Sequence, residues 1–485
     1  MTARAELIRP ATLAGRGLRG AAGAGFTALL VLAPLNFGST RAGGAEVITA
    51  GCAGAALLWT AALLCGGPRA AVPAGAVACV ALFLLAALPW ITGLARPTTV
   101  ADFTRAHFAK VAARWPSSVV WHTSASALAF ALALAAAALP LIDLARSRDW
   151  ALVFGITLVL TAVAVALLAL LQHYTHATGV YWRPDGRLPG NFSGTFYHHT
   201  SAGAYYNTSW PLAFALAWLA RDRPGPATAA GLATVILLAA HGSHVSRFPQ
   251  VAALLVAPLL LCKLQVRGTG RWLVILGGAA LVVLLVAVAG RTATIGARWQ
   301  EMWAPAPGGP ESAPLRESDW PALMRDDLFV PHPSRSGWFG DRGEGWRTAL
   351  RAIAERPLTG HGPGNWMGAA SRHTDDPFVR TFFQFLQFTH QDLLQFAVEW
   401  GLPAALGWWG LLVGAIASAL FLRAGPDPVR QALGIAAACA LAAVLLQAQA
   451  DFPLQMPAIA FNIIVLAALG WAAHSGPRSA PLSPA

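Results

Sequence analysis

The sequence predicts an all-α integral membrane protein with about twelve transmembrane helices and one large extracytoplasmic loop, at about 291–390, before helix ten. Composition is the first observation behind this fold class: 56% of the 485 residues are hydrophobic and 12% are charged. Soluble domains carry ~25% charged residues, so this chain cannot cover a water-facing surface of its size. The second observation is that many apolar stretches reach the ~20 residues needed to cross a bilayer. The third is a single long hydrophilic segment that interrupts them.

Each predicted span must be a helix, because backbone amides in hydrocarbon have no water to bond. The spans divide the chain into a membrane domain of helices 1–9 (1–290), the loop with short helices (291–390), and a second membrane part with helices 10–12 (391–485). In order, the twelve spans are about 20–38, 44–66, 71–93, 120–144, 150–172, 201–220, 227–243, 248–262, 271–290, 393–421, 429–449 and 456–473.

The distribution of Arg and Lys predicts the orientation. A cytoplasmic N-terminus places most basic residues of the short loops inside, as the positive-inside rule requires, although loop 94–119 carries several on the outside. The C-terminus is then also cytoplasmic, and the basic N-terminal segment leads into a retained first helix rather than a cleaved signal peptide. Every histidine except His474 falls at or near the outer face. Histidine transfers protons near neutral pH, so we expect chemistry there; the alternative is a general preference of ring side chains for interfaces.

Within the long loop, Trp346, Leu350 and Ile353 recur at helical spacing, with Arg347 offset from their face. This helix should stop at Pro357, and the Gly-His-Gly-Pro-Gly sequence of 360–364 predicts a tight turn.

Charge and cysteine usage exclude other classes of protein. The net charge of +12 could suggest a nucleic-acid partner, but the basic residues are mostly single Arg between apolar spans, so we expect none. The five cysteines fall inside apolar spans, with no CxxC and no Cys/His ligand spacing. We therefore predict no disulfide, no metal and no cofactor.

Four polar clusters lie at the predicted outer face. In the first, Arg183 and Arg187 precede a Gly-rich stretch and the pair His198 and His199. The planar guanidinium of Arg donates two hydrogen bonds at once, which suits phosphate. The alternative is interfacial snorkelling of Arg beside a glycine turn.

The second cluster joins spans seven and eight and contains His241, His244, Ser246 and Arg247. A charge close to hydrocarbon is costly and is functional by default. Because Arg247 follows two His and two Ser, a polar pocket is favoured over a simple anchor.

The third cluster lies where the loop enters span ten, with His390, Gln391, Gln395 and Glu399 partly at i, i+4 spacing. The dipole at a helix N-terminus disfavours imidazolium, so a neutral His390 could accept a proton from an alcohol; a plain interfacial histidine is the alternative. In the fourth cluster, Asp451 is the only acid of loop 450–457 and could orient His390 or Arg247, or simply end a helix.

These clusters, in this order, resemble the O-antigen ligase and polymerase superfamily of bacterial membrane glycosyltransferases. The resemblance covers roughly 170–470, while the first four spans match only as hydrophobic helices. Three short motifs carry the resemblance: Gly-Thr-Phe at 194–196, Ser-Arg at 246–247, and Thr-His at 389–390 together with residues 394–395 and 399–401. Two longer segments, 356–365 and 451–458, carry it as well.

The resemblance implies transfer of a glycan from an undecaprenyl-pyrophosphate carrier to an acceptor hydroxyl, on the periplasmic side of the bacterial inner membrane, without metal. It implies that Arg247 and Arg187 contact the pyrophosphate and that His390 is the base. Where many members have an Asn-rich stretch, this chain has Tyr-His-His-Thr-Ser at 197–201, which leaves the roles of His198 and His199 open.

Three functions remain as hypotheses: a ligase with a lipid, glycan or protein acceptor, a polymerase that uses the same site, and a transporter of lipid-linked glycan. Transporters place ionisable groups near the bilayer midplane, whereas these groups gather at one face. For the enzymes, in-line attack would invert the anomeric centre, and the carrier would enter sideways from the membrane lipid. The catalytic candidates are His390, Glu399 and Asp451, and the substrate-binding candidates are Arg247, Arg187, Arg183, His198, His199, Ser246, His244 and Arg347.

Overall fold

The computed structural model describes residues 12–92, 96–97, 117–118, 121–184, 192–244, 246–264, 340–373, 388–422, 425 and 427–473. Apart from a two-residue parallel pair, β1 (Arg96–Pro97) with β2 (Ser117–Ser118), the regular structure of these residues is helical. The helices are α1 (Leu13–Leu35), η1 (Phe37–Ser39), α2 (Gly44–Leu64), α3 (Ala74–Ile91), α5 (Trp121–Ala145), α6 (Arg148–Tyr174), η2 (Val180–Trp182), α7 (His199–Asn207), α8 (Trp210–Leu219), α9 (Pro224–Ser243), α10 (Arg247–Lys263), α14 (Gly340–Glu355), α15 (Trp366–Arg372), α17 (Asp392–Trp400), α18 (Leu402–Phe421), α19 (Pro428–Gln447), η4 (Pro453–Gln455) and α20 (Pro457–Ala473).

The all-helical fold agrees with the prediction, and several helices can span a membrane. Within the described part of the chain, eight helices are long and apolar enough to cross a membrane, namely α1, α2, α3, α5, α6, α9, α18 and α19. Helix α20 is apolar but shorter. The predicted ninth span, 271–290, lies outside the described residues, as does most of the loop 291–390.

Two predicted spans were wrong as continuous helices. Predicted span 201–220 consists of α7 and α8, and Pro211 occupies the first turn of α8, where its missing N–H costs nothing. Predicted span 393–421 breaks into α17 and α18 at Gly401, whose φ is +82°. A Cβ at Gly401 would overlap the backbone oxygen of Leu358. The first break falls at the polar residues Asn207, Thr208 and Ser209, and the second falls at a single glycine.

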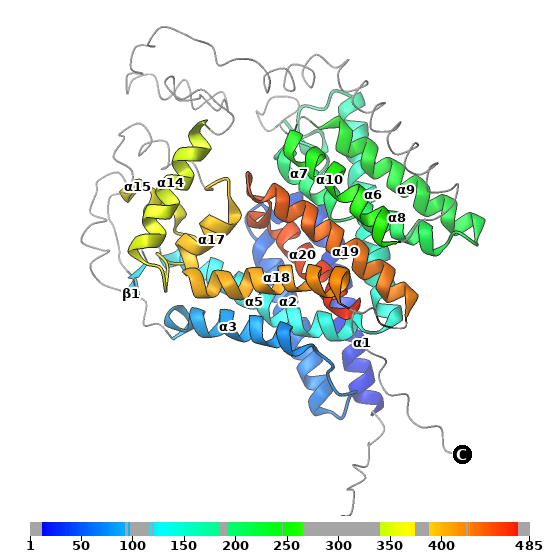
Figure 1. The fold of residues 1–485 in the computed structure, drawn as a ribbon, viewed down its shortest axis with the longest axis horizontal. Coiled ribbons are helices and arrows are strands. Elements are labelled where there is room, and N and C mark those ends of the chain that lie inside the picture. The colour runs from blue at the N-terminus through cyan, green and yellow to red at the C-terminus, as the bar shows by residue number, and fades with distance from the viewer. Residues whose placement is uncertain are drawn as a thin grey trace, which may run out of the picture.

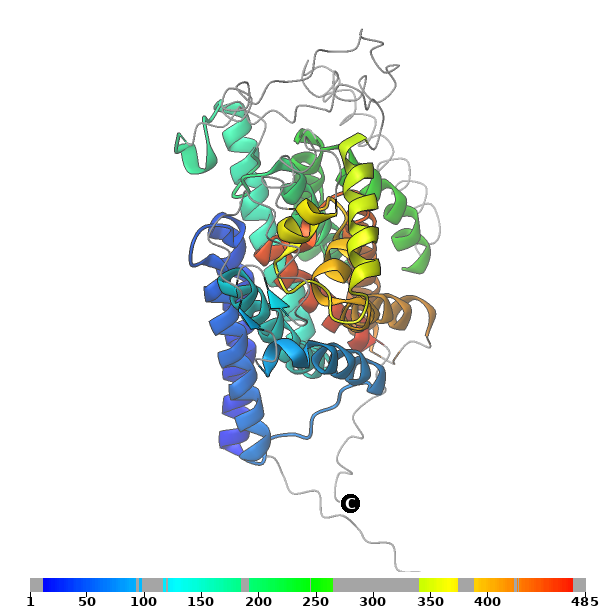
Figure 2. The same ribbon diagram turned by 90° about the vertical axis from the view of Figure 1, so that its left-hand side faces the viewer.

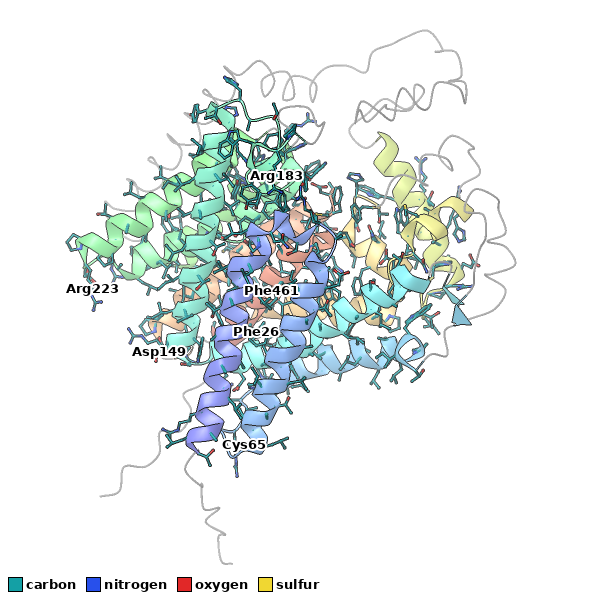
Figure 3. All side chains as sticks on the ribbon, turned by 180° about the vertical axis from the view of Figure 1, so that it is seen from behind. Phe26, Cys65, Asp149, Arg183, Arg223 and Phe461 are labelled. Carbon is teal, nitrogen blue, oxygen red and sulfur yellow. The ribbon has the colours of Figure 1, made fainter. Side chains whose placement is uncertain are left out.

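Helix α20 lies at the centre of the bundle (Figure 1). It is buried along almost its whole length and packs against α19, α18 and α5. On another side, Phe26 of α1 stacks on Phe461 with ring centroids 6.5 Å apart (Figure 3). The long N-terminal helices α1 and α2 pack against each other beside this centre.

Helices α14 and α15 pack with α17 on one side of the bundle, where they form what we call the helical cap (residues 340–373, yellow in Figure 2, with α17, in orange). The cap has its own small core, made of Ala349, Ala352, Trp366, Ala369, Ala370 and Val398. The predicted helix end is confirmed, since α14 stops two residues before Pro357. The predicted turn is confirmed as well: Gly360, Gly362 and Gly364 have φ of +68°, +106° and +68°.

Candidate functional site

His390 lies immediately before α17 in a strained backbone conformation. Its φ is +55°, a region that costs residues other than glycine energy unless their surroundings hold them there. Thr389 is held on one side, because its N–H and its hydroxyl each donate to Gln395 Oε1 at 3.0 Å. On the other side, the Asp392 N–H donates to the Ala448 carbonyl at 2.9 Å. The backbone on both sides of His390 is therefore held by α17 and by the end of α19.

Asp451 is the acidic neighbour of His390. Its Oδ1 lies 3.7 Å from His390 Nδ1, and the two side chains are 2% and 7% exposed. This separation is too long for a hydrogen bond, but a buried carboxylate so close stabilises the imidazolium that forms when histidine takes a proton. The Phe452 N–H and Gln447 Nε2 donate to the Asp451 carboxylate at 3.0 and 3.3 Å, which fixes its position.

The ring of Phe452 brings three of the predicted clusters together. Its centroid lies 4.5 Å from that of Phe388, 4.8 Å from His390 and 5.3 Å from His198. His198 is also held by the start of α7, since its Nδ1 lies 2.6 Å from Thr200 Oγ1. Gln447 adds a second link, because its Nε2 donates to the Thr200 carbonyl at 2.9 Å.

The second cluster lies where α9 ends and α10 begins. The Ser246 N–H donates to His244 Nδ1 at 3.1 Å, so the proton of this imidazole is on Nε2, which lies 3.4 Å from His241 Nδ1. Gln250 Nε2 donates to the carbonyls of His241 and His244 at 3.2 and 3.0 Å. Burial, with His241 and then His199 nearby, lowers the pKa of His244, which lies between the two helices.

Arg247 is the first residue of α10, and Ser246 is its N-cap without a side-chain cap bond. The guanidinium and the positive end of the helix dipole therefore belong to the same helix end, an arrangement that suits an anion. Helix α7 packs directly against this loop at Gly203. A Cβ there would lie 2.7 Å from His244 Nε2 and 2.6 Å from Pro249 Cγ.

Helix α7 thus joins the two halves of the candidate site. His198, at its N-cap, contacts Phe452 on the His390 side, and Gly203 contacts the Arg247 side. At 1.5 Å of rise per residue, these two positions are only about 7–8 Å apart along the helix axis. His199 lies between them in sequence and is half-buried.

Glu399 connects the helical cap to the His390 segment without contacting His390 in any bond given by the structure. Its Oε2 accepts from the Gly364 N–H at 2.9 Å, and its Oε1 accepts from Gln395 Nε2 at 3.1 Å. Because Gln395 in turn accepts from Thr389, Glu399 is linked to His390 through two residues. Burial raises the pKa of Glu399 to about 7.

The remaining candidates lie farther out. Arg183 is exposed, with its Cζ 6.0 Å from the Phe37 ring, at the end of the molecule opposite Cys65 (Figure 3). Arg41 lies over the same ring at 3.6 Å and its Nε donates to the Tyr197 hydroxyl at 2.8 Å, so Arg183 is near the segment before His198. Arg347 is exposed on α14. Arg187 lies outside the described residues.

Three parts of the site were not predicted. The first two are the central ring of Phe452 and the link through Gln447. The third is Asp392, which accepts from the Leu454 N–H at 2.8 Å and from Gln455 Nε2 at 2.9 Å. Asp392 is 1% exposed, and an acid at the edge of an apolar span is itself a signal that could have identified it.

A separate group of metal-binding residue types in the helical cap was also missed. Among the described residues, one donor atom from each of Glu355, His361 and His373 lies within 4.8 Å of the other two. Cysteine-based ligand spacing cannot indicate this group, because its residues are two histidines and a glutamate spread over the cap.

The sequence was compared with models of known protein families, and one of them matches. The family model described as O-antigen ligase matches residues 229–409. The match includes Arg247, the turn at 360–364, His390 and Glu399, whereas Asp451 and α7 lie outside it. No curated protein matches the chain. The match confirms the resemblance carried by the motifs: residues 229–409 are similar to the O-antigen ligase family.

Proposed function

We propose that this chain transfers a glycan from an undecaprenyl-pyrophosphate carrier to an acceptor hydroxyl at the outer face of the bacterial inner membrane, as a metal-independent inverting glycosyltransferase of the ligase type. The family match supports glycan transfer of the ligase or polymerase kind. The single observation that carries the mechanism is the buried pair of His390 and Asp451, linked through Phe452 and α7 to the loop that ends at Arg247.

His390 is the proposed general base. It takes the proton of the acceptor hydroxyl while that oxygen bonds to the anomeric carbon of the donor sugar. The bond between this carbon and the phosphate oxygen breaks, and its electron pair leaves with undecaprenyl pyrophosphate. A well-placed base contributes ~10²–10⁴-fold, and Asp451 favours the imidazolium produced in this step.

Arg247 is the proposed pyrophosphate ligand, assisted by Ser246, His244 and the N-terminus of α10. Negative charge grows on the pyrophosphate as the sugar leaves, so a fixed guanidinium stabilises the transition state more than the ground state. We assign Arg183, Arg187 and Arg347 to outer contacts with the donor or acceptor.

His198 and His199 lie between the base and the phosphate ligand, where the sugar would sit. Glu399 is proposed as a positioning residue for the His390 segment.

The site is proposed to open outward, with both termini of the chain cytoplasmic and the carrier entering from membrane lipid. A polymerase that extends repeat units would use the same residues and differ only in its acceptor. A transporter of lipid-linked glycan is the alternative of another class, and the gathering of polar groups around α7 and Phe452 speaks against it.

The experiment uses the purified chain in lipid, with undecaprenyl-pyrophosphate glycan as donor and a lipid, glycan or protein acceptor, without added metal. We expect His390→Ala to abolish transfer and to retain donor binding, because the phosphate contacts come from Arg247. His173→Ala, at an exposed position near the end of α6, is the matched control and should transfer normally.

Full transfer by His390→Ala would remove this residue from the mechanism. If the wild-type protein moves the lipid across the bilayer and never forms a glycosidic bond, it is a transporter. Products that grow by repeat units would identify a polymerase.

A further inference from the structure

The helical cap contains a cluster of three side chains that the transfer reaction does not use. His373 Nε2 lies 2.7 Å from Glu355 Oε2, and the rings of His361 and His373 have centroids 5.5 Å apart at 73°. One donor atom from each of the three residues lies within 4.8 Å of the other two. Glu355 comes from the end of α14 and His373 from the end of α15, so the cluster bridges both helices.

One ring nitrogen of His361 bonds to the backbone, as in many metal-binding histidines. Its Nε2 lies 2.9 Å from the Ala352 carbonyl, and since a carbonyl can only accept, Nε2 carries the proton. The lone pair of the imidazole is therefore on Nδ1. Histidine ligands characteristically donate their other N–H to a backbone carbonyl in this way.

Charged groups of both signs surround the cluster. Glu355 is the last residue of α14, where the helix dipole presents its negative end. Arg351 donates from Nη1 to the His373 carbonyl at 3.1 Å, which fixes the backbone of that residue. The Arg356 guanidinium lowers the pKa of His361 and opposes a cation, while the Glu355 carboxylate acts in the opposite direction.

We propose that Glu355, His361 and His373 bind a divalent transition metal of the Zn²⁺ type, which clamps the helical cap. Two imidazoles and one carboxylate are a donor set that Zn²⁺ accepts, with water in the fourth position. A bound metal would add stability to the helical cap, because four of the six residues in the core of the cap are alanines. Small cores of this kind are commonly stabilised by a structural metal.

The clamp would act on the candidate site from a distance. The segment between Glu355 and His373 includes the glycine turn that bonds to α17. There, the Gly362 N–H donates to the Glu399 carbonyl at 3.0 Å and the Gly364 N–H donates to Glu399 Oε2 at 2.9 Å. The metal thus holds the turn in place and takes no part in the transfer step.

The test uses the untagged full chain in lipid nanodiscs, stripped with a chelator and titrated with ZnCl₂ by calorimetry. We expect one tightly bound equivalent and an increase in Tm on binding. X-ray absorption at the zinc edge should show only nitrogen and oxygen ligands, at about 2.0–2.1 Å. His373→Ala and Glu355→Gln should each weaken binding at least about tenfold, while the control His173→Ala should bind as the wild type does.

The two variants are suitable because their side chains are partly accessible, at 14% and 27% exposed, so each should fold even if His361→Ala does not. The absence of a stoichiometric site would overturn the proposal. So would wild-type affinity in both variants, or a zinc spectrum with sulfur ligands, which would assign the metal to cysteines.

Discussion

His390 Nδ1 and Asp451 Oδ1 lie 3.7 Å apart, although one residue precedes α17 and the other follows α19. Both side chains are almost completely buried. The neighbouring Thr389 N–H donates to Gln395, and the Asp451 carboxylate accepts from the Phe452 N–H. The pair therefore exists only if the α17 region and the α19–α20 connection are docked on each other. Asp392 makes this docking specific, because its carboxylate accepts hydrogen bonds from the N–H of Leu454 and from the side chain of Gln455.

The first prediction concerns Asp451→Asn. Its amide keeps the shape of the side chain and removes the charge that stabilises imidazolium, so we expect transfer to fall by about 10²–10⁴-fold. Donor binding should not change. The measurement is single-turnover transfer with saturating donor, over a range of pH. Transfer within a few-fold of wild type would show that His390 acts without this carboxylate.

The second prediction is that Arg247→Lys impairs transfer although it keeps the positive charge. An ammonium cannot reproduce the two-pronged contact of guanidinium with phosphate. We expect a fall of roughly 10²-fold, the effect of losing one transition-state donor. Arg223→Lys is the matched control, because Arg223 is an exposed N-cap residue at the other end of α9. Equal rates for the two variants would make Arg247 a simple anchor.

The elements that sequence analysis predicted well are local ones. Helical spacing around Trp346 predicted α14, and the glycines of 360–364 predicted the turn, because a few neighbouring residues decide both. Contacts between distant segments were not accessible in this way. Nothing in the neighbourhood of Phe452 indicates that its ring meets both His198 and His390. Likewise, the break at Gly401 depends on the approach of a backbone more than forty residues away in sequence, at Leu358.

The third prediction tests whether α7 joins the two halves of the site. In Gly203→Ala, the new Cβ would lie within 3 Å of both His244 and Pro249. Overpacking of this kind costs about 1–3 kcal/mol, and α7 would shift away from the Arg247 loop. We expect weaker donor binding and a lower Tm. In Gly231→Ala, the control in α9, the new Cβ meets nothing within 4 Å, so stability should be unchanged or slightly higher.

The fourth prediction concerns pH and Glu399. Burial raises the pKa of Glu399 from 4.5 to about 7, so the folded protein holds this proton more tightly than the unfolded chain does. Its contribution to stability is complete below pH 4.5 and is lost as pH rises through about 7. The size of this effect is roughly 2–4 kcal/mol.

Glu399→Gln should remove this dependence. Thermal unfolding at pH 5 and pH 8 measures the change in stability of each protein with pH. Comparing this change between wild type and variant cancels the contribution of His361, which both proteins share. The pKa of His361 is lowered to about 4. Its contribution to stability is therefore lost as pH falls toward 4, whereas that of Glu399 is lost as pH rises. The assignment fails if the two proteins respond identically to pH.

The fifth prediction concerns orientation. Cys65 is exposed, and Tyr174 is 73% exposed at the end of α6. The end of α6 lies near Arg183, because Trp182 Nε1 donates to Thr175 Oγ1 at 2.9 Å, and Arg183 lies at the end of the molecule opposite Cys65 (Figure 3). With the other cysteines replaced, an impermeant maleimide applied to intact cells should label Tyr174→Cys. A variant that retains only Cys65 should react after the membrane is opened. The reverse pattern would place the site on the cytoplasmic side.

Helix α20 has a consequence for biosynthesis. It is enclosed by α1, α5, α18 and α19, and all of these precede it in the chain. The ribosome therefore delivers the centre of the bundle after the helices that surround it. Those earlier helices cannot reach their final packing until α20 has entered the membrane. Because Asp451 and Phe452 lie just before α20, the base of the candidate site acquires its partners only in this late stage of assembly.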